Sequence, residues 1–174
     1  MSMSARSSAA AGPVAHPLAP VWDADSRVLI LGTLPSPASR QAGFYYMHPQ
    51  TRFWPVLAAL FDQPVPQGPE ARRAFALAHR IALWDTLASC TITGASDASI
   101  QDPVPNDLGP ILAGAPIRAV FTTGAAADRF YRRFQYPRTG LAAHRLPSPS
   151  AANCATPFDR LVQEYTAILP FLQP

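Results

Sequence analysis

Aromatic and hydroxyl side chains gather in one stretch of the sequence, between an apolar run that begins at Val28 and a helical pattern that ends at Leu60. The loop inside this stretch carries several prolines, several Ser and Thr residues, and the adjacent pair Tyr45 and Tyr46. Aromatic rings can stack on a flat base, and hydroxyl groups can hold a sugar-phosphate backbone. This composition indicates a site that recognises a flat ring.

Motifs of several other kinds of site are absent. The chain has no GxxxxGK[ST], GxGxxG or GxSxG pattern, the signatures of triphosphate, dinucleotide and serine hydrolase sites. Cys90 and Cys154 lie far apart without other soft ligands around them, so we expect no metal and no iron–sulfur cluster. Asp85 and Asp97 could face a cleft, but Asp at a strand end is more typical of an anchor or cap than of a base. We therefore expect no covalent catalysis and no cofactor.

Four short apolar runs predict the strands that must position these residues. They cover residues 28–31, 81–84, 117–121 and 142–146. Helical patterns cover residues 53–60, 70–79, 125–134 and 157–169, and a shorter one runs from a cap at Asn106 or Asp107 to residue 113. The alternation predicts a doubly wound parallel sheet with helices on both faces, and the polar segment 89–106 is expected to be a long loop.

Three of the connecting loops should meet at one edge of this sheet. The carboxyl ends of parallel strands share an edge, and open α/β sheets bind ligands there. The loops after the first, third and fourth strands then place Thr33 to Thr51, Thr123, and Ser148 to Asn153 around one cleft.

The 174 residues fit one domain. Residues 1–20 are rich in Ser, Ala and Pro without periodicity, which predicts a disordered tail before a single domain over residues 21–174. A transit peptide is the other interpretation of this segment, but it lacks an amphipathic pattern. No apolar run is as long as a membrane span, and the N-terminus lacks the apolar core of a signal peptide. We expect a cytoplasmic monomer without membrane association. Two buried free thiols are the favoured state of its cysteines, and a single disulfide is the other interpretation.

All 14 basic residues are Arg, and the formal net charge is +3. Arg is suited to bidentate contact with phosphate, so this balance is compatible with a nucleic-acid partner. Codon bias in an Ala-, Pro- and Arg-rich proteome explains the same composition, and the charge alone does not decide between them.

A series of short motifs resembles the uracil-DNA glycosylase superfamily, and most of all its hypoxanthine-DNA glycosylase branch, also called DNA-deoxyinosine glycosylase. The motifs are GTLPSPAS, FYYMHPQTRFWPVL, ALWDTLASC, GASDASI, VPND, TTG and LPSPSAAN, in this order between residues 32 and 153. The resemblance implies a three-layer α/β/α sandwich on a four-stranded parallel sheet. It also implies a monofunctional glycosylase of base excision repair that flips a deaminated base out of damaged DNA and hydrolyses its N-glycosidic bond without a cofactor.

The resemblance further implies the roles of individual residues. The catalytic positions, beside the attacking water, would be Thr51, Thr33 and Leu34. The base-binding positions would be Gly32, Pro35, Tyr46, Phe53 and Thr123, with Phe53 stacking on the flipped base. The DNA-binding positions would be Ser36, Ser39, Arg145, Ser148, Ser150 and Asn153.

Two threonines depart from the family pattern. Thr51 stands where the family usually has an Asn that positions water, and Thr123 where it usually has an Asn that reads the base. A hydroxyl lacks the paired carbonyl and amide of Asn. Leu34 and Leu146 also replace polar residues of the uracil-specific relatives. Three functions stay open: excision of a deaminated purine or uracil, a glycosylase fold that binds DNA or a nucleobase without cleavage, and an unrelated small-molecule hydrolase.

Overall fold

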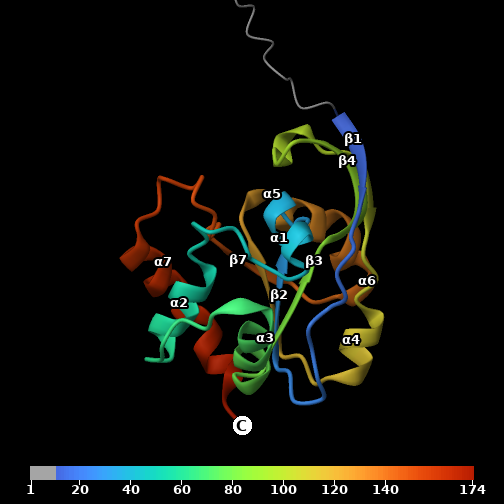
Figure 1. Ribbon diagram of the computed structural model, residues 1–174. Coiled ribbons are helices and arrows are strands. Elements are labelled where there is room, and N and C mark those ends of the chain that lie inside the picture. The colour runs from blue at the N-terminus through green and yellow to red at the C-terminus, as the bar shows by residue number, and fades with distance from the viewer. Residues whose placement is uncertain (1–10) are drawn as a thin grey trace, which may run out of the picture.

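Four parallel strands form the central sheet of the computed structural model, which describes residues 11–174 (Figure 1). The strands are β2 (Val28–Gly32), β3 (Ile81–Asp85), β6 (Ala119–Thr123) and β7 (Ala143–Leu146), in the order β3-β2-β6-β7. Each neighbouring pair is parallel. The strands predicted from the apolar runs are confirmed, and with them the α/β fold.

Helices cover both faces of this sheet (Figure 1). One face carries α2 (Phe53–Leu60), α3 (Gly68–Ala78) and α7 (Phe158–Tyr165). The other carries α4 (Gly109–Gly114) and a helical segment that runs from α5 (Ala125–Phe130) through a π-helical turn (Tyr131–Gln135) to α6 (Tyr136–Thr139). The short α1 (Pro37–Ala42) lies in the loop after β2, and 3₁₀ turns occupy Asp97–Ser99 and Thr166–Leu172.

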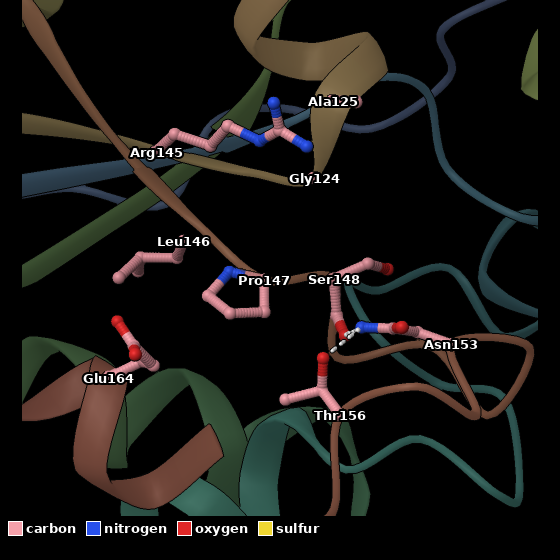
Figure 2. Close-up of a pocket in the computed structure, with 9 residues that line it drawn as sticks. All are labelled: Gly124, Ala125, Arg145, Leu146, Pro147, Ser148, Asn153, Thr156 and Glu164. Atoms are coloured by element: carbon pink, nitrogen blue, oxygen red, sulfur yellow. Dashed lines mark hydrogen bonds between the residues drawn. The ribbon is translucent and has the colours of Figure 1, made fainter. Parts of the chain in front are cut away.

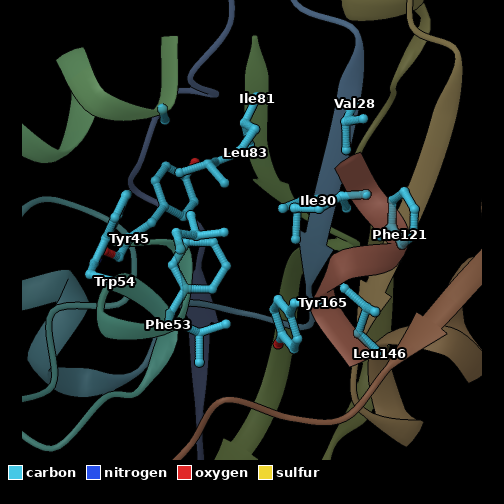
Figure 3. Close-up of a cluster of buried hydrophobic side chains, with 14 of the residues drawn as sticks. Val28, Ile30, Tyr45, Phe53, Trp54, Ile81, Leu83, Phe121, Leu146 and Tyr165 are labelled. Atoms are coloured by element: carbon cyan, nitrogen blue, oxygen red, sulfur yellow. The ribbon is translucent and has the colours of Figure 1, made fainter. Parts of the chain in front are cut away.

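The strand β2 shows why the sheet is covered twice. Val28 and Ile30 belong to one buried cluster, which includes side chains of α2, α3 and α7 (Figure 3). Leu29 and Leu31 belong to a second cluster, which includes Tyr131 and side chains of α4. Successive side chains of a strand point to opposite faces, so a continuous apolar run requires apolar cover on both.

A second sheet adjoins the first, and the expectation of a long loop over residues 89–106 is wrong. The strands β1 (Ala11–Ala15), β4 (Leu87–Thr93) and β5 (Gln101–Pro105) pair antiparallel in the order β1-β4-β5. Cys90 and Ile92 of β4 are buried in a third cluster with Leu87 and Phe130. The apolar alternation is short and lies among Ser and Thr residues, so the composition resembles that of a loop.

Residues 11–20 belong to the folded part, which corrects the expected domain boundary at residue 21. β1 pairs with β4 along its whole length, and the backbone N–H of His16 then donates to the Ala88 carbonyl at 2.7 Å. The Tyr45 hydroxyl donates to the Ala19 carbonyl at 2.9 Å. Backbone pairing of this kind depends little on side-chain composition. The tail expected over residues 1–10 lies outside the described residues.

Cys90 is buried and Cys154 is exposed, and both are free thiols, so the expectation of two buried thiols is wrong for Cys154. Within residues 11–174, no helix has the length and apolar character needed to cross a membrane.

Candidate functional site

Polar side chains from two strand ends and from the loop before α2 surround Gly32, the last residue of β2. Gly32 pairs with Asp85 at the end of β3, and Thr123 ends the neighbouring β6. A β-carbon on Gly32 would lie 2.5 Å from Asp85 Oδ1, 3.6 Å from Thr123 Oγ1 and 3.5 Å from the Tyr46 hydroxyl. The missing side chain leaves space for a carboxylate and two hydroxyls. We call Gly32, Tyr46, Asp85 and Thr123 the Gly32 cluster.

Tyr46 supplies the aromatic ring of this cluster. Its ring stacks on Phe53 with 3.8 Å between centroids and 12° between planes. Phe53 is fully buried, so the structure corrects its expected role as the stacking surface for a base: Tyr46 covers it and is itself half-buried. Burial, and then the charge of Asp85, raises the pKa of Tyr46, so its hydroxyl remains protonated.

The loop between β2 and α2 holds Tyr46 in a left-handed backbone conformation, with φ of 52°. This conformation costs about 1 kcal/mol or more for a residue other than Gly, so neighbouring contacts must hold it. The indole N–H of Trp54 and a guanidinium N–H of Arg72 donate to the Tyr46 carbonyl at 3.1 and 3.3 Å. The backbone N–H of Met47 donates to Ser39 Oγ at 3.1 Å.

Ser36 and Ser39 build helix α1. The Ser36 hydroxyl caps this helix: it accepts from the Ser39 N–H at 3.2 Å and donates to Ser39 Oγ at 3.1 Å. Ser39 is only 2% exposed. The expected contact between Ser39 and DNA is therefore wrong, because this hydroxyl is enclosed by the loop that it stabilises.

Thr33, Leu34 and Pro35 shape the same edge of the sheet. Thr33 is buried, and its carbonyl accepts from the Leu87 N–H at 3.1 Å. Pro35 is also buried. Leu34 packs against the third cluster, beside the second sheet. The place of Leu34 among the catalytic positions stays a prediction.

Thr51 lies where the loop enters α2. It is half-buried, and its Oγ1 accepts from the backbone N–H of Phe53 at 3.3 Å. The next residue, Arg52, donates its backbone N–H to the Pro149 carbonyl at 3.0 Å. Thr51 is thereby joined to the loop that follows β7.

Arg52 is a residue that the sequence analysis misses. Its guanidinium donates to three backbone carbonyls of the loop after β7, at 2.9, 2.8 and 2.5 Å, namely those of Ser150, Asn153 and Thr156. A planar guanidinium can hold several acceptors at once. The sequence shows an Arg directly before the aromatic pair that begins α2, which could have indicated a role for Arg52. It does not show that the partners of Arg52 lie about one hundred residues away.

The loop of residues 147–156, here called the Ser148 loop, is held mainly through its own backbone. Ser148 Oγ accepts from the Ser150 N–H, and Ser150 Oγ from the Ala152 N–H, both at 3.2 Å. The Asn153 amide donates to the Ser148 carbonyl at 3.0 Å and to Thr156 Oγ1 at 3.2 Å. This geometry agrees with a supporting role for Asn153.

A hollow opens between the Ser148 loop and β7 (Figure 2). Arg145 extends along one side of it and is exposed, with Ser148 and Asn153 opposite. Gly124, which follows Thr123, forms part of the wall, and a β-carbon there would lie 3.3 Å from Ser148 Cβ. The Gly32 cluster and the Ser148 loop are therefore neighbours at one edge of the sheet, as the sequence predicts.

Asp85 has a partner that the sequence analysis assigns to the tail. His16 Nε2 lies 2.7 Å from Asp85 Oδ2, and the two side chains are 3% and 6% exposed. The Leu18 N–H donates to His16 Nδ1 at 3.2 Å, so the proton is on Nε2 and is donated to the carboxylate. Asp85 is thus the buried anchor that the sequence favours, but one of its oxygens faces Gly32.

Comparison with known proteins agrees with these observations. The family described as the uracil DNA glycosylase superfamily matches residues 19–170. A curated hypoxanthine DNA glycosylase from Methanosarcina acetivorans is 29% identical over 135 residues, which cover 76% of this chain and 84% of that protein. Its namesake from Methanosarcina barkeri is 32% identical over 113 residues, which cover 64% and 72% of the two chains.

A solved structure shares the fold. It is a solution NMR structure of a proposed uracil DNA glycosylase from Methanosarcina acetivorans, with a TM-score of 0.76 and 27% sequence identity. The match covers 89% of this chain and 96% of the other.

Proposed function

The chain belongs to the uracil DNA glycosylase superfamily, and from this membership we propose that it removes hypoxanthine from DNA by hydrolysing the N-glycosidic bond of deoxyinosine. The observation that carries the proposal is the Gly32 cluster, in which a stacked ring and the polar side chains of two strand ends lie around Gly32. A flipped base needs a stacking surface and polar groups at its edge. The cluster offers both.

Tyr46 is the proposed stacking surface. One face of its ring lies on Phe53, which keeps the ring fixed, and the residue remains half-buried. A base placed on the other face would direct one edge toward Thr123, whose hydroxyl lies 3.4 Å from that of Tyr46. Stacking of a base on an aromatic side chain contributes about 1–3 kcal/mol and tolerates different bases. The groups that face the hydrogen-bonding edge of the base must therefore select which base is bound.

Thr51 is the proposed water-positioning residue. Its Oγ1 accepts the Phe53 N–H, which leaves the hydroxyl proton and a further lone pair for a water molecule. A water held beside the anomeric carbon would attack as the glycosidic bond breaks and positive charge develops on the sugar. No covalent intermediate and no metal is part of this proposal.

The Ser148 loop is the proposed contact with the DNA backbone. Ser150 and Arg145 are exposed. The Arg52 guanidinium donates to three carbonyls of the loop, and Arg52 directly follows Thr51 in the chain. Phosphate contacts fix the register of a protein on DNA without reading the sequence. The loop would therefore place the flipped nucleotide relative to Thr51 and the Gly32 cluster.

The test is cleavage of duplex oligonucleotides that carry one inosine, uracil, xanthine or simple mismatch. Abasic sites are revealed by alkali under single-turnover conditions, and binding is measured on the same substrates. We expect cleavage at inosine and none in the undamaged duplex. Binding without cleavage of any of these bases would overturn the enzymatic proposal and favour a glycosylase fold that only binds DNA or a nucleobase.

A further inference from the structure

One oxygen of Asp85 is held by the protein and the other is available. Oδ2 accepts from His16, whereas among the described residues Oδ1 has no hydrogen-bond partner and lies over Gly32. The residue is only 4% exposed. Buried carboxylate oxygens normally have a donor, so Oδ1 is an acceptor that a ligand can satisfy.

Thr123 provides a donor beside this acceptor. Its hydroxyl lies 3.4 Å from both the Leu31 carbonyl and the Tyr46 hydroxyl. These separations exceed the roughly 2.5–3.0 Å of a normal O–H···O hydrogen bond, so the Thr123 hydroxyl can turn to a ligand at little cost.

We propose that Asp85 and Thr123 together read the edge of the flipped base, with Asp85 Oδ1 accepting a ring N–H and the Thr123 hydroxyl donating to the adjacent carbonyl. This inference rests on the proposed function and names its specificity-determining pair. The ligand class is a base with a lactam edge, in which a ring N–H adjoins a C=O. Two side chains then supply the acceptor and the donor that a single Asn amide would otherwise combine.

Deamination creates this edge. Adenine has a ring nitrogen that accepts and an amino group that donates, and hypoxanthine reverses both. Against adenine, Asp85 Oδ1 would meet a lone pair and lose its donor, which is costly for a buried carboxylate. Hypoxanthine, xanthine and uracil all satisfy the pair. Guanine and thymine carry the same edge, but in intact duplexes they are paired, and a paired base costs more to flip than a mismatched one.

His16 acts through Asp85 and is a positioning residue. It comes from the segment after β1, its ring contacts Tyr45 and Trp84 edgewise or at a tilt, and its Nε2–H fixes Oδ2. The orientation of Oδ1 over Gly32 therefore depends on the attachment of β1 to β4.

The backbone around Asp85 is also held. The Asn106 amide donates to the carbonyls of Asp85 and Leu87, both at 3.0 Å, and the Gln135 amide donates to the Thr86 carbonyl at 2.7 Å. A carboxylate whose backbone and one oxygen are both fixed can discriminate between ligands by hydrogen-bond polarity, because it cannot turn away from a mismatched ligand.

The test measures binding of the free bases hypoxanthine and adenine by the wild-type protein, followed by amide chemical shifts of Gly32 and Gly124. The assay requires no cleavage, so it separates this inference from the proposed function. We expect hypoxanthine to bind about tenfold or more tightly than adenine, the scale of one good hydrogen-bonded pair. In Asp85→Asn, whose oxygen would keep the His16 N–H and whose NH2 would face the base, the preference should be lost or reversed. In the isosteric Thr123→Val it should fall to nearly equal binding.

Asp128→Asn is the matched control, because Asp128 is a buried carboxylate that bonds to Thr122 and Arg132 outside the cluster. It should keep the preference. His16→Asn keeps an amide donor and should retain more of the preference for hypoxanthine than His16→Ala. A merely structural role of His16 would not predict this difference. If Asp85→Asn does not fold, Thr123→Val decides. Equal binding of both bases by the wild type, or an unchanged preference in Thr123→Val, would overturn the inference.

Discussion

The Gly32 cluster and the Ser148 loop adjoin at one edge of the sheet, yet they are built in opposite ways. In the cluster, the half-buried Tyr46 lies beside two buried side chains at strand ends, Asp85 with 4% and Thr123 with 9% exposure. In the loop, Arg52 binds three backbone carbonyls and Ser150 is exposed, as is Arg145 of the adjoining β7. Buried polar side chains suit recognition of a flipped base, because the base is transferred from water into the protein. An exposed loop suits contact with the phosphate backbone, because the phosphates stay in solvent.

This difference predicts how each region responds to substitution. Groups in the cluster are buried and lie close together, so a change there should alter the rate or the choice of base. Ser150 of the loop and Arg145 beside it are exposed, so a change there should alter affinity and its dependence on salt.

Gly32→Ala should have the largest effect. The added carbon would lie 2.5 Å from Asp85 Oδ1, so the carboxylate must move. Displacement of a reacting or reading group by about 1 Å can lower a rate about 10²-fold, and we expect at least that loss in single-turnover cleavage of inosine DNA. Gly12→Ala is the control, because a carbon there meets nothing within 4 Å. A wild-type rate in Gly32→Ala would remove the cluster from the site.

Thr51→Ala should lower the single-turnover rate about 10²-fold, or close to 3 kcal/mol, while DNA affinity stays nearly unchanged. The hydroxyl is the proposed holder of the water, and its loss also removes the acceptor of the Phe53 N–H. Thr51→Asn restores a carbonyl acceptor and should keep or raise the rate. If Thr51→Ala cleaves like the wild type, another group holds the water.

Arg52→Ala should weaken DNA binding about tenfold, because three carbonyls lose a charged donor and the Ser148 loop loses its arrangement. Arg52→Lys should recover only part of this affinity, since an ammonium lacks the planar fork. Arg160→Ala is the control, an exposed Arg paired with Glu164. A variant that loses rate at saturating DNA with unchanged affinity would assign Arg52 to the chemistry and break the division between the two regions.

Arg145→Ala should have the smallest effect, a few-fold loss of affinity with no change in the preferred base. The residue is exposed and lines the hollow beside the Ser148 loop. If it neutralises one phosphate, the slope of log affinity against log salt should decrease by about 0.9. Measurement of the slope on inosine and undamaged duplexes checks this, and a changed base preference would contradict it.

The sequence predicted those residues of the candidate site whose position follows from a local motif. Gly32, Thr51, Thr123 and Ser148 follow strand ends or begin a helix, and they lie at the predicted edge. Phe53 and Ser39 were assigned to contact DNA, and both are buried instead. A motif identifies a position in the chain but not which of two neighbouring rings covers the other.

The apolar pattern of the chain was enough to predict the parallel sheet and the helices on its faces. The strand β2 is buried on both faces and is therefore continuously apolar, and α2 is buried on one face and therefore has apolar residues at helical spacing. Both patterns can be seen in the sequence. Three features are visible only in the folded chain: the second sheet, the contact of His16 with Asp85, and the hydrogen bonds from Arg52 to the Ser148 loop. These depend on backbone hydrogen bonds and on polar contacts between residues far apart in the chain, which leave no periodic signal in the sequence.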